Sequence, residues 1–188
     1  MFDNKSKYWL IAWAGSIICF IALSMHLPVS LLTTAGHDDA LFIKNAQHII
    51  SGDWLGPYNQ MTLAKGPAYS IFIALNAFLG IPLTLSVSLF YLISCALLVR
   101  SISLIGLNCA FGFLLFNILI FQPAIFPTRI VRENIYVSLT LLVISGLIYL
   151  AEQEEDQKLM LVKNIFFGLA FGIYWITREE GIWIFPAV

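Results

Sequence analysis

The stretch GHDDALF, residues 36–42, opens the longest polar interval in a chain whose remaining sequence is strongly apolar. It follows an apolar run from Tyr8 to Leu32, and the polar interval continues to the tripeptide KGP at 65–67. Two adjacent carboxylates, Asp38 and Asp39, therefore lie a few residues outside a hydrophobic segment. Charged groups beside a membrane are costly unless they are paired or used. This stretch is the first candidate for a functional site.

The composition indicates a membrane protein. Of the 188 residues, 60% are hydrophobic and only 11% are charged, whereas about a quarter of the residues in soluble domains are charged. Lipid is the solvent that accepts so much apolar surface. The ten basic residues are dispersed among segment ends, which argues against a nucleic-acid partner. Three cysteines lie inside apolar runs without metal-ligand spacing, and we expect them to be packing residues.

Hydropathy predicts an all-α, polytopic transmembrane bundle that forms one domain over residues 1–188. A span needs about 20 apolar residues, and the expected spans are 8–32, 83–99, 104–121, 135–151 and 161–176. Lys5 and Lys7 precede the first span, which is too long for a cleaved signal peptide, so we expect an uncleaved anchor with a cytoplasmic N-terminus. The apolar segment that begins at Gly181 stops abruptly. We therefore expect a fragment or the N-terminal half of a longer protein.

Two juxtamembrane surface helices are expected in the first outer loop, residues 33–82. The segment 38–51 is amphipathic and would lie flat on the membrane. The segment 66–79 is apolar but short for a span. If 66–79 nevertheless crossed the membrane, the arginines after the later spans would lie inside. If it stays on the surface, as its length favours, the acidic pair and these arginines gather on the outer side.

The acidic pair has a functional and a structural interpretation. Either carboxylate could act as a general base on an acceptor hydroxyl, tuned by its neighbour. Alternatively, one of them caps the surface helix through a side-chain oxygen. His37 together with Asp38 and Asp39 is a candidate set of ligands for a divalent metal ion, although no cofactor is certain.

Three cationic positions are candidates for phosphate binding. Lys65 precedes a helix N-terminus, where anions bind favourably, although a lysine at a helix start also snorkels. Arg129 and Arg132 are three residues apart, so on a helix they face one way and could clamp a phosphate. The alternative is a span boundary at which arginine pairs with Glu133. Arg178 and Glu179 form a third polar group, either supporting the site or ending a helix.

These features resemble the GT-C class of polytopic membrane glycosyltransferases, especially the branch of protein O-mannosyltransferases and aminoarabinose transferases. The resemblance rests on the signal anchor, the acidic pair Asp38-Asp39, the Lys65-Gly66-Pro67 start of a juxtamembrane helix, and the later loop with Arg129, Arg132 and Glu133. Members of this class often have Asp-Glu and Lys-Pro-Pro or His-Pro-Pro at these places, so the match is not complete.

The resemblance implies an inverting hexosyl or pentosyl transfer from a polyprenyl-phosphate sugar to a hydroxyl of a lipid, glycan or protein. Asp38 would be the base and Asp39 its neighbour, while Lys65, Arg129 and Arg132 would meet the donor phosphate. The site would lie on the outer face of a multi-pass protein, as in a bacterial cytoplasmic membrane. The alternatives are a non-enzymatic carrier of a lipid-linked sugar and a structural subunit of a membrane complex.

Overall fold

The computed structural model describes residues 4–30, 39–57, 65–106, 108–151 and 157–178. Within these ranges every regular element is a helix, and the only other pairing is an isolated bridge between Ser30 and Arg129. The elements are α1 (Asn4–His26), α2 (Asp39–Ile50), α3 (Ala68–Leu79), α4 (Leu83–Leu104), α5 (Cys109–Ile120), the 3₁₀ helix η1 (Pro123–Ile125), α6 (Glu133–Ala151) and α7 (Gln157–Thr177). The predicted all-α class is confirmed.

Four helices in the described ranges are long and apolar enough to cross a membrane. They are Lys7–His26 in α1 and the whole of α4, α6 and α7, with 19 to 22 residues each. Many of their large apolar side chains face outward, such as Phe166 with 70% of its surface exposed. Such an outer surface suits lipid better than water.

The region of the expected span 104–121 contains a shorter helix. α4 continues to Leu104, and α5 begins only at Cys109, where the Asn108 side chain accepts a hydrogen bond from the backbone N–H of Phe111. With 12 residues, α5 is about 18 Å long, well short of the hydrocarbon thickness of a bilayer. Gln122 and η1 follow α5 and carry the chain toward α6.

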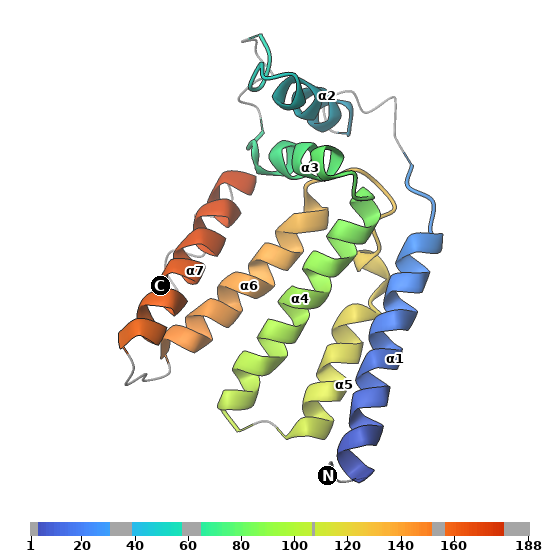
Figure 1. Cartoon of the computed structure of the whole chain (residues 1–188), viewed down its shortest axis with the longest axis vertical. Helices are drawn as coiled ribbons and strands as arrows, with labels where there is room; N and C mark the ends of the chain where they lie inside the picture. The colour runs from blue at the N-terminus through green and yellow to red at the C-terminus, as the bar shows by residue number, and fades with distance from the viewer. Residues whose placement is uncertain (1–3, 31–38, 58–64, 107, 152–156, 179–188) are drawn as a thin grey trace.

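The long helices lie side by side, and α2 and α3 lie across one end of them (Figure 1). α4 contacts α1, α5 and α6, while α7 packs on α6. α2 rests on α3, which touches both α4 and α7. The two crossing helices correspond to the predicted surface helices 38–51 and 66–79. We call the end that they cover the α2/α3 end.

Two apolar clusters hold these helices together. The first joins α1, α4 and α5 through Phe20, Tyr91, Cys95, Phe116 and Ile120 and their neighbours. The second joins α2, α3, α6 and α7 through Phe42, Tyr69, Ile135, Leu139, Val143 and Tyr174. Because the second cluster contains residues of α2 and α3 as well as of the long helices α6 and α7, it fixes the α2/α3 end to the bundle.

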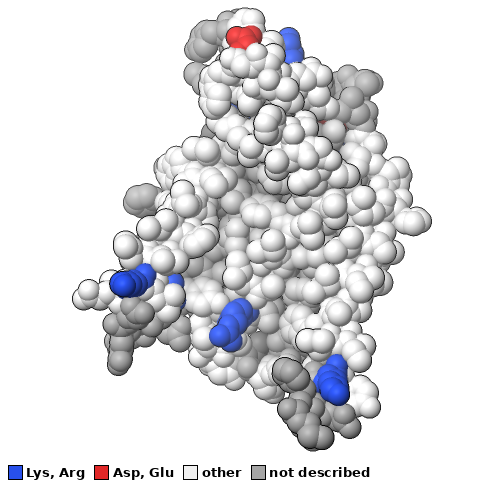
Figure 2. Space-filling model, viewed as in Figure 1, with Lys and Arg blue, Asp and Glu red and all other residues white. Residues whose placement is uncertain are grey.

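Charged side chains are confined to the two ends of the described structure. Figure 2 shows a broad uncharged surface between the basic side chains at the lower end of the view and the charged side chains at the α2/α3 end. Lys7 lies in the first turns of α1, Arg100 in the last turns of α4 and Lys158 at the start of α7, all at the end opposite α2 and α3 (Figure 1). This distribution is typical of helices whose middle parts lie in a bilayer.

Candidate functional site

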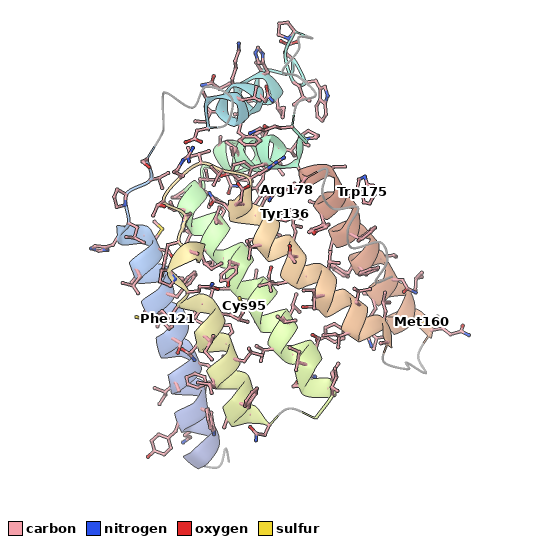
Figure 3. All side chains as sticks on the ribbon, turned by 180° about the vertical axis from the view of Figure 1, so that it is seen from behind. Cys95, Phe121, Tyr136, Met160, Trp175 and Arg178 are labelled. Atoms are coloured by element: carbon pink, nitrogen blue, oxygen red, sulfur yellow. The ribbon has the colours of Figure 1, made fainter. Side chains whose placement is uncertain are left out.

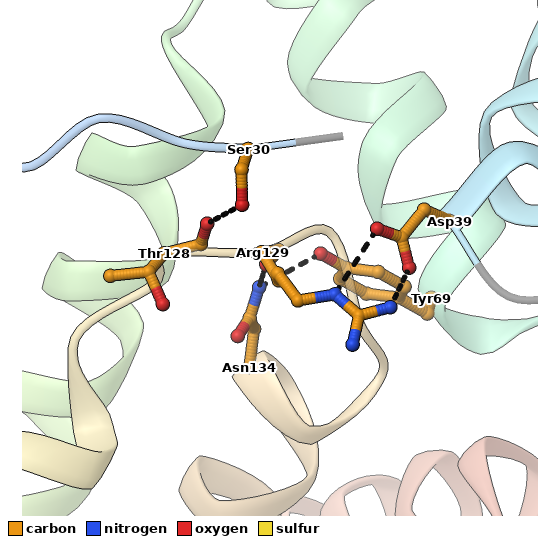
Figure 4. Close-up of polar contacts among 6 residues, drawn as sticks. All are labelled: Ser30, Asp39, Tyr69, Thr128, Arg129 and Asn134. Atoms are coloured by element: carbon orange, nitrogen blue, oxygen red, sulfur yellow. Dashed lines mark hydrogen bonds and ion pairs between the residues drawn. The ribbon is translucent and has the colours of Figure 1, made fainter. Parts of the chain in front are cut away.

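Asp39 is the first residue of α2 and is completely buried. Its two carboxylate oxygens accept hydrogen bonds from Arg129, at 2.8 Å from Nη2 to Oδ1 and 3.3 Å from Nε to Oδ2 (Figure 4). The Arg129 side chain is 35% exposed. A buried carboxylate is costly unless a hydrogen-bonded cation compensates it. This two-point contact supplies that cation, and it ties the start of α2 to the segment before α6.

Backbone and side-chain hydrogen bonds hold the Arg129 segment in place. The N–H and the hydroxyl of Ser30 both donate to the carbonyl oxygen of Thr128, at 2.8 and 3.0 Å. Asn134 donates from Nδ2 to the carbonyl oxygen of Arg129 at 2.6 Å and to the hydroxyl of Tyr69 at 3.1 Å. Burial raises the pKa of Tyr69 well above its usual value. Arg129 is therefore positioned through its backbone as well as through Asp39.

Glu133, the first residue of α6, lies between two arginines. Its Oε1 is 3.6 Å from Nη1 of Arg178 and 4.0 Å from Nε of Arg132. A carboxylate in the first turn of a helix also interacts favourably with the helix dipole. The Glu133 side chain remains 51% exposed, so we expect these ion pairs to add little to stability.

The end of α7 is anchored to α6 through stacked aromatic rings. Figure 3 labels Tyr136 of α6 and Arg178, which follows α7. The guanidinium carbon of Arg178 lies 5.3 Å from the centroid of the Tyr136 ring. Tyr136 stacks on Tyr174 at 4.8 Å between centroids, and the two hydroxyls are 2.6 Å apart. Arg178 therefore approaches Glu133 while its guanidinium lies over the Tyr136 ring, an arrangement that cation–π attraction favours.

Lys65 and Arg132 line a cavity of about 230 Å³ together with Phe42, Val131 and Glu133. Nζ of Lys65 lies over the Phe42 ring, 5.5 Å from its centroid. The neighbouring Gly66 packs tightly on the end of α7, because a Cβ placed there would be only 1.9 Å from the carbonyl oxygen of Ile176. Glycine is thus required at this point, and its contact brings the lysine beside α7 and α6.

The structure brings most of the predicted site residues to the α2/α3 end. Asp39 contacts Arg129, Glu133 lies beside Arg132 and Arg178, and Lys65 lines the same cavity as Arg132 and Glu133. Asp38, His37 and Glu179 lie outside the described residues. Among the residues that are described, no group of three or more His, Cys, Asp or Glu side chains could hold a metal ion, so a metal site involving His37 stays a prediction.

Sequence reasoning missed four supporting residues of this site: Tyr69, Asn134, Tyr136 and Tyr174. All four lie within the first or last turn of an apolar helix, where a polar aromatic or amide side chain can leave the lipid for a partner. A polar aromatic or amide residue in the first or last turn of an apolar helix is therefore a signal that could have identified these residues. Their partners were not predictable, because each contact joins residues that are distant in the sequence, except that from Asn134 to Arg129.

Comparisons of the chain with protein-family models, curated proteins and solved structures find no match. The function must therefore be inferred from the geometry of the site and from the chemistry of its residues.

Proposed function

We propose that the chain is a membrane glycosyltransferase, or the N-terminal part of one, which moves a sugar from a polyprenyl-phosphate donor to an acceptor hydroxyl. The observation that carries the proposal is the cavity lined by Lys65 and Arg132 at the end of an apolar helical bundle. A lipid-linked phosphate bound there would have its charged group beside Lys65 and Arg132 and its hydrocarbon chain among the helices. Lysine and arginine are the residues that bind phosphate most strongly.

The cations would act on the leaving group. When the bond between the anomeric carbon and the phosphate oxygen breaks, its electron pair goes to the phosphate, which gains negative charge. Fixed cations that stabilise this charge, in a site with little water, lower the barrier more than they would in solution. We assign this role to Lys65 and Arg132, because both line the cavity. Arg129 binds Asp39 through both of its oxygens and does not line that cavity.

The attacking oxygen needs a base that accepts its proton as the new bond to the anomeric carbon forms. A positioned carboxylate contributes about 10²- to 10⁴-fold to such a step. We assign the proton transfer to Asp38, the residue before the buried Asp39. Asp39 then has the separate role of holding Arg129 and the start of α2, which would position its neighbour.

The test is sugar transfer from polyprenyl-phosphate donors in membranes that contain the full-length gene product. We expect Asp38→Asn to lower the rate about 10²-fold or more with unchanged insertion and stability. Asp39→Asn should lower both the rate and the stability. The matched control is Asp53→Asn, because Asp53 is an exposed carboxylate at the same end that contacts His48 at 3.2 Å, and this variant should keep the wild-type rate.

Two results would count against this assignment. If Asp38→Asn keeps the wild-type rate, Asp38 is not the base. If the wild type transfers no sugar from any donor while it inserts normally, the carrier or subunit alternative is favoured instead.

A further inference from the structure

α5 ends well short of the α2/α3 end, whereas α1 and α4 beside it continue to that end (Figure 1). A contact with α4 gives the depth at which α5 ends. The hydroxyl of Tyr91 donates a hydrogen bond of 2.9 Å to the carbonyl oxygen of Leu119, in the last turn of α5. Tyr91 lies about two turns after Leu83, the first residue of α4, which is about 12 Å along the helix axis. The end of α5 therefore lies at a depth where α4 is still a regular apolar helix.

The segment that follows α5 stays at a similar depth as far as Phe126. Figure 3 labels Phe121 at the end of α5, part-way along the bundle. The ring of Phe126 packs on Phe20 of α1, with 5.5 Å between the ring centroids. Phe20 lies about 9 Å along the helix axis before His26, the last residue of α1. Between Phe121 and Phe126 the regular structure is the three-residue helix η1.

Two prolines keep this segment from satisfying its backbone as a helix would. Pro123 and Pro127 have no N–H, so the carbonyl oxygens four residues before them, those of Leu119 and Pro123, lack the usual helical donor. Tyr91 supplies a donor to Leu119. Among the described residues no backbone N–H donates to the carbonyl oxygen of Pro123. This oxygen therefore needs a donor from elsewhere.

The same part of the segment is not covered by the rest of the described structure. Gln122, Pro123 and Ala124 are all exposed, and Gln122 carries an amide that both donates and accepts hydrogen bonds. Lipid chains cannot hydrogen-bond, so irregular backbone does not occur in contact with them. A hydrophobic helix that is shorter than the bilayer is also accommodated by local thinning of the bilayer. Both considerations indicate that water meets this segment.

We propose that the membrane surface is indented beside the end of α5, so that water from the side of α2 and α3 reaches Gln122. The partner of this surface is water, which hydrogen-bonds to the Gln122 amide and to the exposed carbonyl oxygens. Around the other faces of α1 and α4, lipid chains extend past the same depth. The inference does not rest on the proposed sugar transfer, because it follows from the length of α5 and from the hydrogen bonding of the segment after it.

The test is the rate at which a membrane-impermeant thiol reagent labels single cysteines in membranes, in a background without the native cysteines. Gln122→Cys should react at least about tenfold faster than Leu89→Cys, because the reactive thiolate forms in water and not in hydrocarbon. Leu89 is the matched control, since it is 40% exposed and lies only about 9 Å along α4 from Leu83, nearer the helix end than Tyr91. Asp53→Cys, at an exposed position of the α2/α3 end, identifies the side from which the reagent must come.

Ala124→Cys repeats the test with a smaller change of side chain, and it should also react faster than Leu89→Cys. If Gln122→Cys and Ala124→Cys both insert normally but react as slowly as Leu89→Cys, lipid or another protein segment covers this surface and the proposal is wrong. Labelling of Leu89→Cys as fast as that of Gln122→Cys also overturns it, because water would then reach this depth without an indentation beside α5. The measurement needs no substrate, so its result is separate from the test of sugar transfer.

Discussion

Both ends of the bundle carry exposed charges, but among the described residues a completely buried charge is found at the α2/α3 end alone. At the end opposite α2 and α3, Lys7, Arg100 and Lys158 are exposed, as water-facing charges usually are. At the α2/α3 end, Asp39 is completely buried against Arg129, and Arg178 lies between a carboxylate and an aromatic ring.

The exposed charges mark the expected boundary between membrane and water, whereas the buried charge belongs to the candidate site. Exposed charges at span ends keep the helices in register with the membrane at little cost. Burial of a charge costs free energy even when the ion pair is well formed, and apolar side chains of similar volume often do as well or better. Stability alone therefore does not explain the buried Asp39–Arg129 pair at the α2/α3 end, and we propose that it serves the candidate site.

The largest expected effect comes from breaking the buried pair. Arg129→Gln removes the guanidinium that binds both oxygens of the buried Asp39 carboxylate, which should lower the free energy of unfolding by about 3–5 kcal/mol. Unfolding in detergent micelles, followed by circular dichroism, measures the change. Arg100→Gln at the opposite end is the control, with an expected change within about 0.5 kcal/mol.

The double variant Asp39→Asn/Arg129→Gln sharpens this result, because it removes both charges. It should be more stable than Arg129→Gln alone. Equal stability of Arg129→Gln and Arg100→Gln would show that the two ends do not differ in this respect.

A smaller effect is expected at the contact between Gly66 and α7. Gly66→Ala places a methyl group against the carbonyl oxygen of Ile176, and the required shift of α7 should cost about 1–3 kcal/mol. The same micelle unfolding measures it. Gly168→Ala is the control, since a Cβ there meets nothing within 4 Å, and the added helix propensity should leave stability unchanged or slightly raised. A Gly66→Ala protein as stable as the wild type would contradict the close approach.

The aromatic anchor of α7 should contribute less. Tyr136→Phe keeps the ring under Arg178 and removes only the hydroxyl that pairs with Tyr174, so the expected loss is about 1 kcal/mol. Tyr149→Phe, in the same helix near its other end, keeps the ring that Lys163 covers and should change stability by less than about 0.5 kcal/mol. Similar losses in both variants would remove the distinction between the two ends.

The smallest expected effect is on the orientation of the protein in the membrane. Replacing Lys7 and Arg100 by Gln should leave stability almost unchanged, but it weakens the positive charge that we expect to hold this end in the cytoplasm. The measurement uses the variant Asp53→Cys in a background without native cysteines. A membrane-impermeant reagent labels this cysteine from outside, and the extent of labelling gives the fraction of protein molecules with the α2/α3 end outside. That fraction should fall modestly, and high labelling from the cytoplasmic side before the replacements would reverse the proposed orientation.

The sequence predicted the helices better than their contacts. Hydropathy located the long helices because a bilayer imposes one length on every span, and Gly80 and Pro82 marked the end of α3 because neither continues a helix. The start of α5 was misplaced toward Leu104, since the residues on both sides of Gly106 are apolar and hydropathy does not register a turn.

Side-chain partners could not be predicted in the same way. The acidic pair and the arginines were predicted to gather at one end, but nothing in the sequence indicated that Asp39 would be buried against Arg129, because 90 residues separate them. The contact between Gly66 and Ile176 was equally hidden, since a glycine before a proline is also typical of an ordinary turn.

The distance between Asp39 and Arg129 along the chain also orders events during synthesis. Asp39 leaves the ribosome 90 residues before its partner, together with the start of α2, while α4 and α5 are still to be made. Until Arg129 emerges, docking of α2 in its final position would bury the Asp39 carboxylate without this guanidinium, which is costly. We therefore expect α2 to dock late, after the helices that follow it have been made.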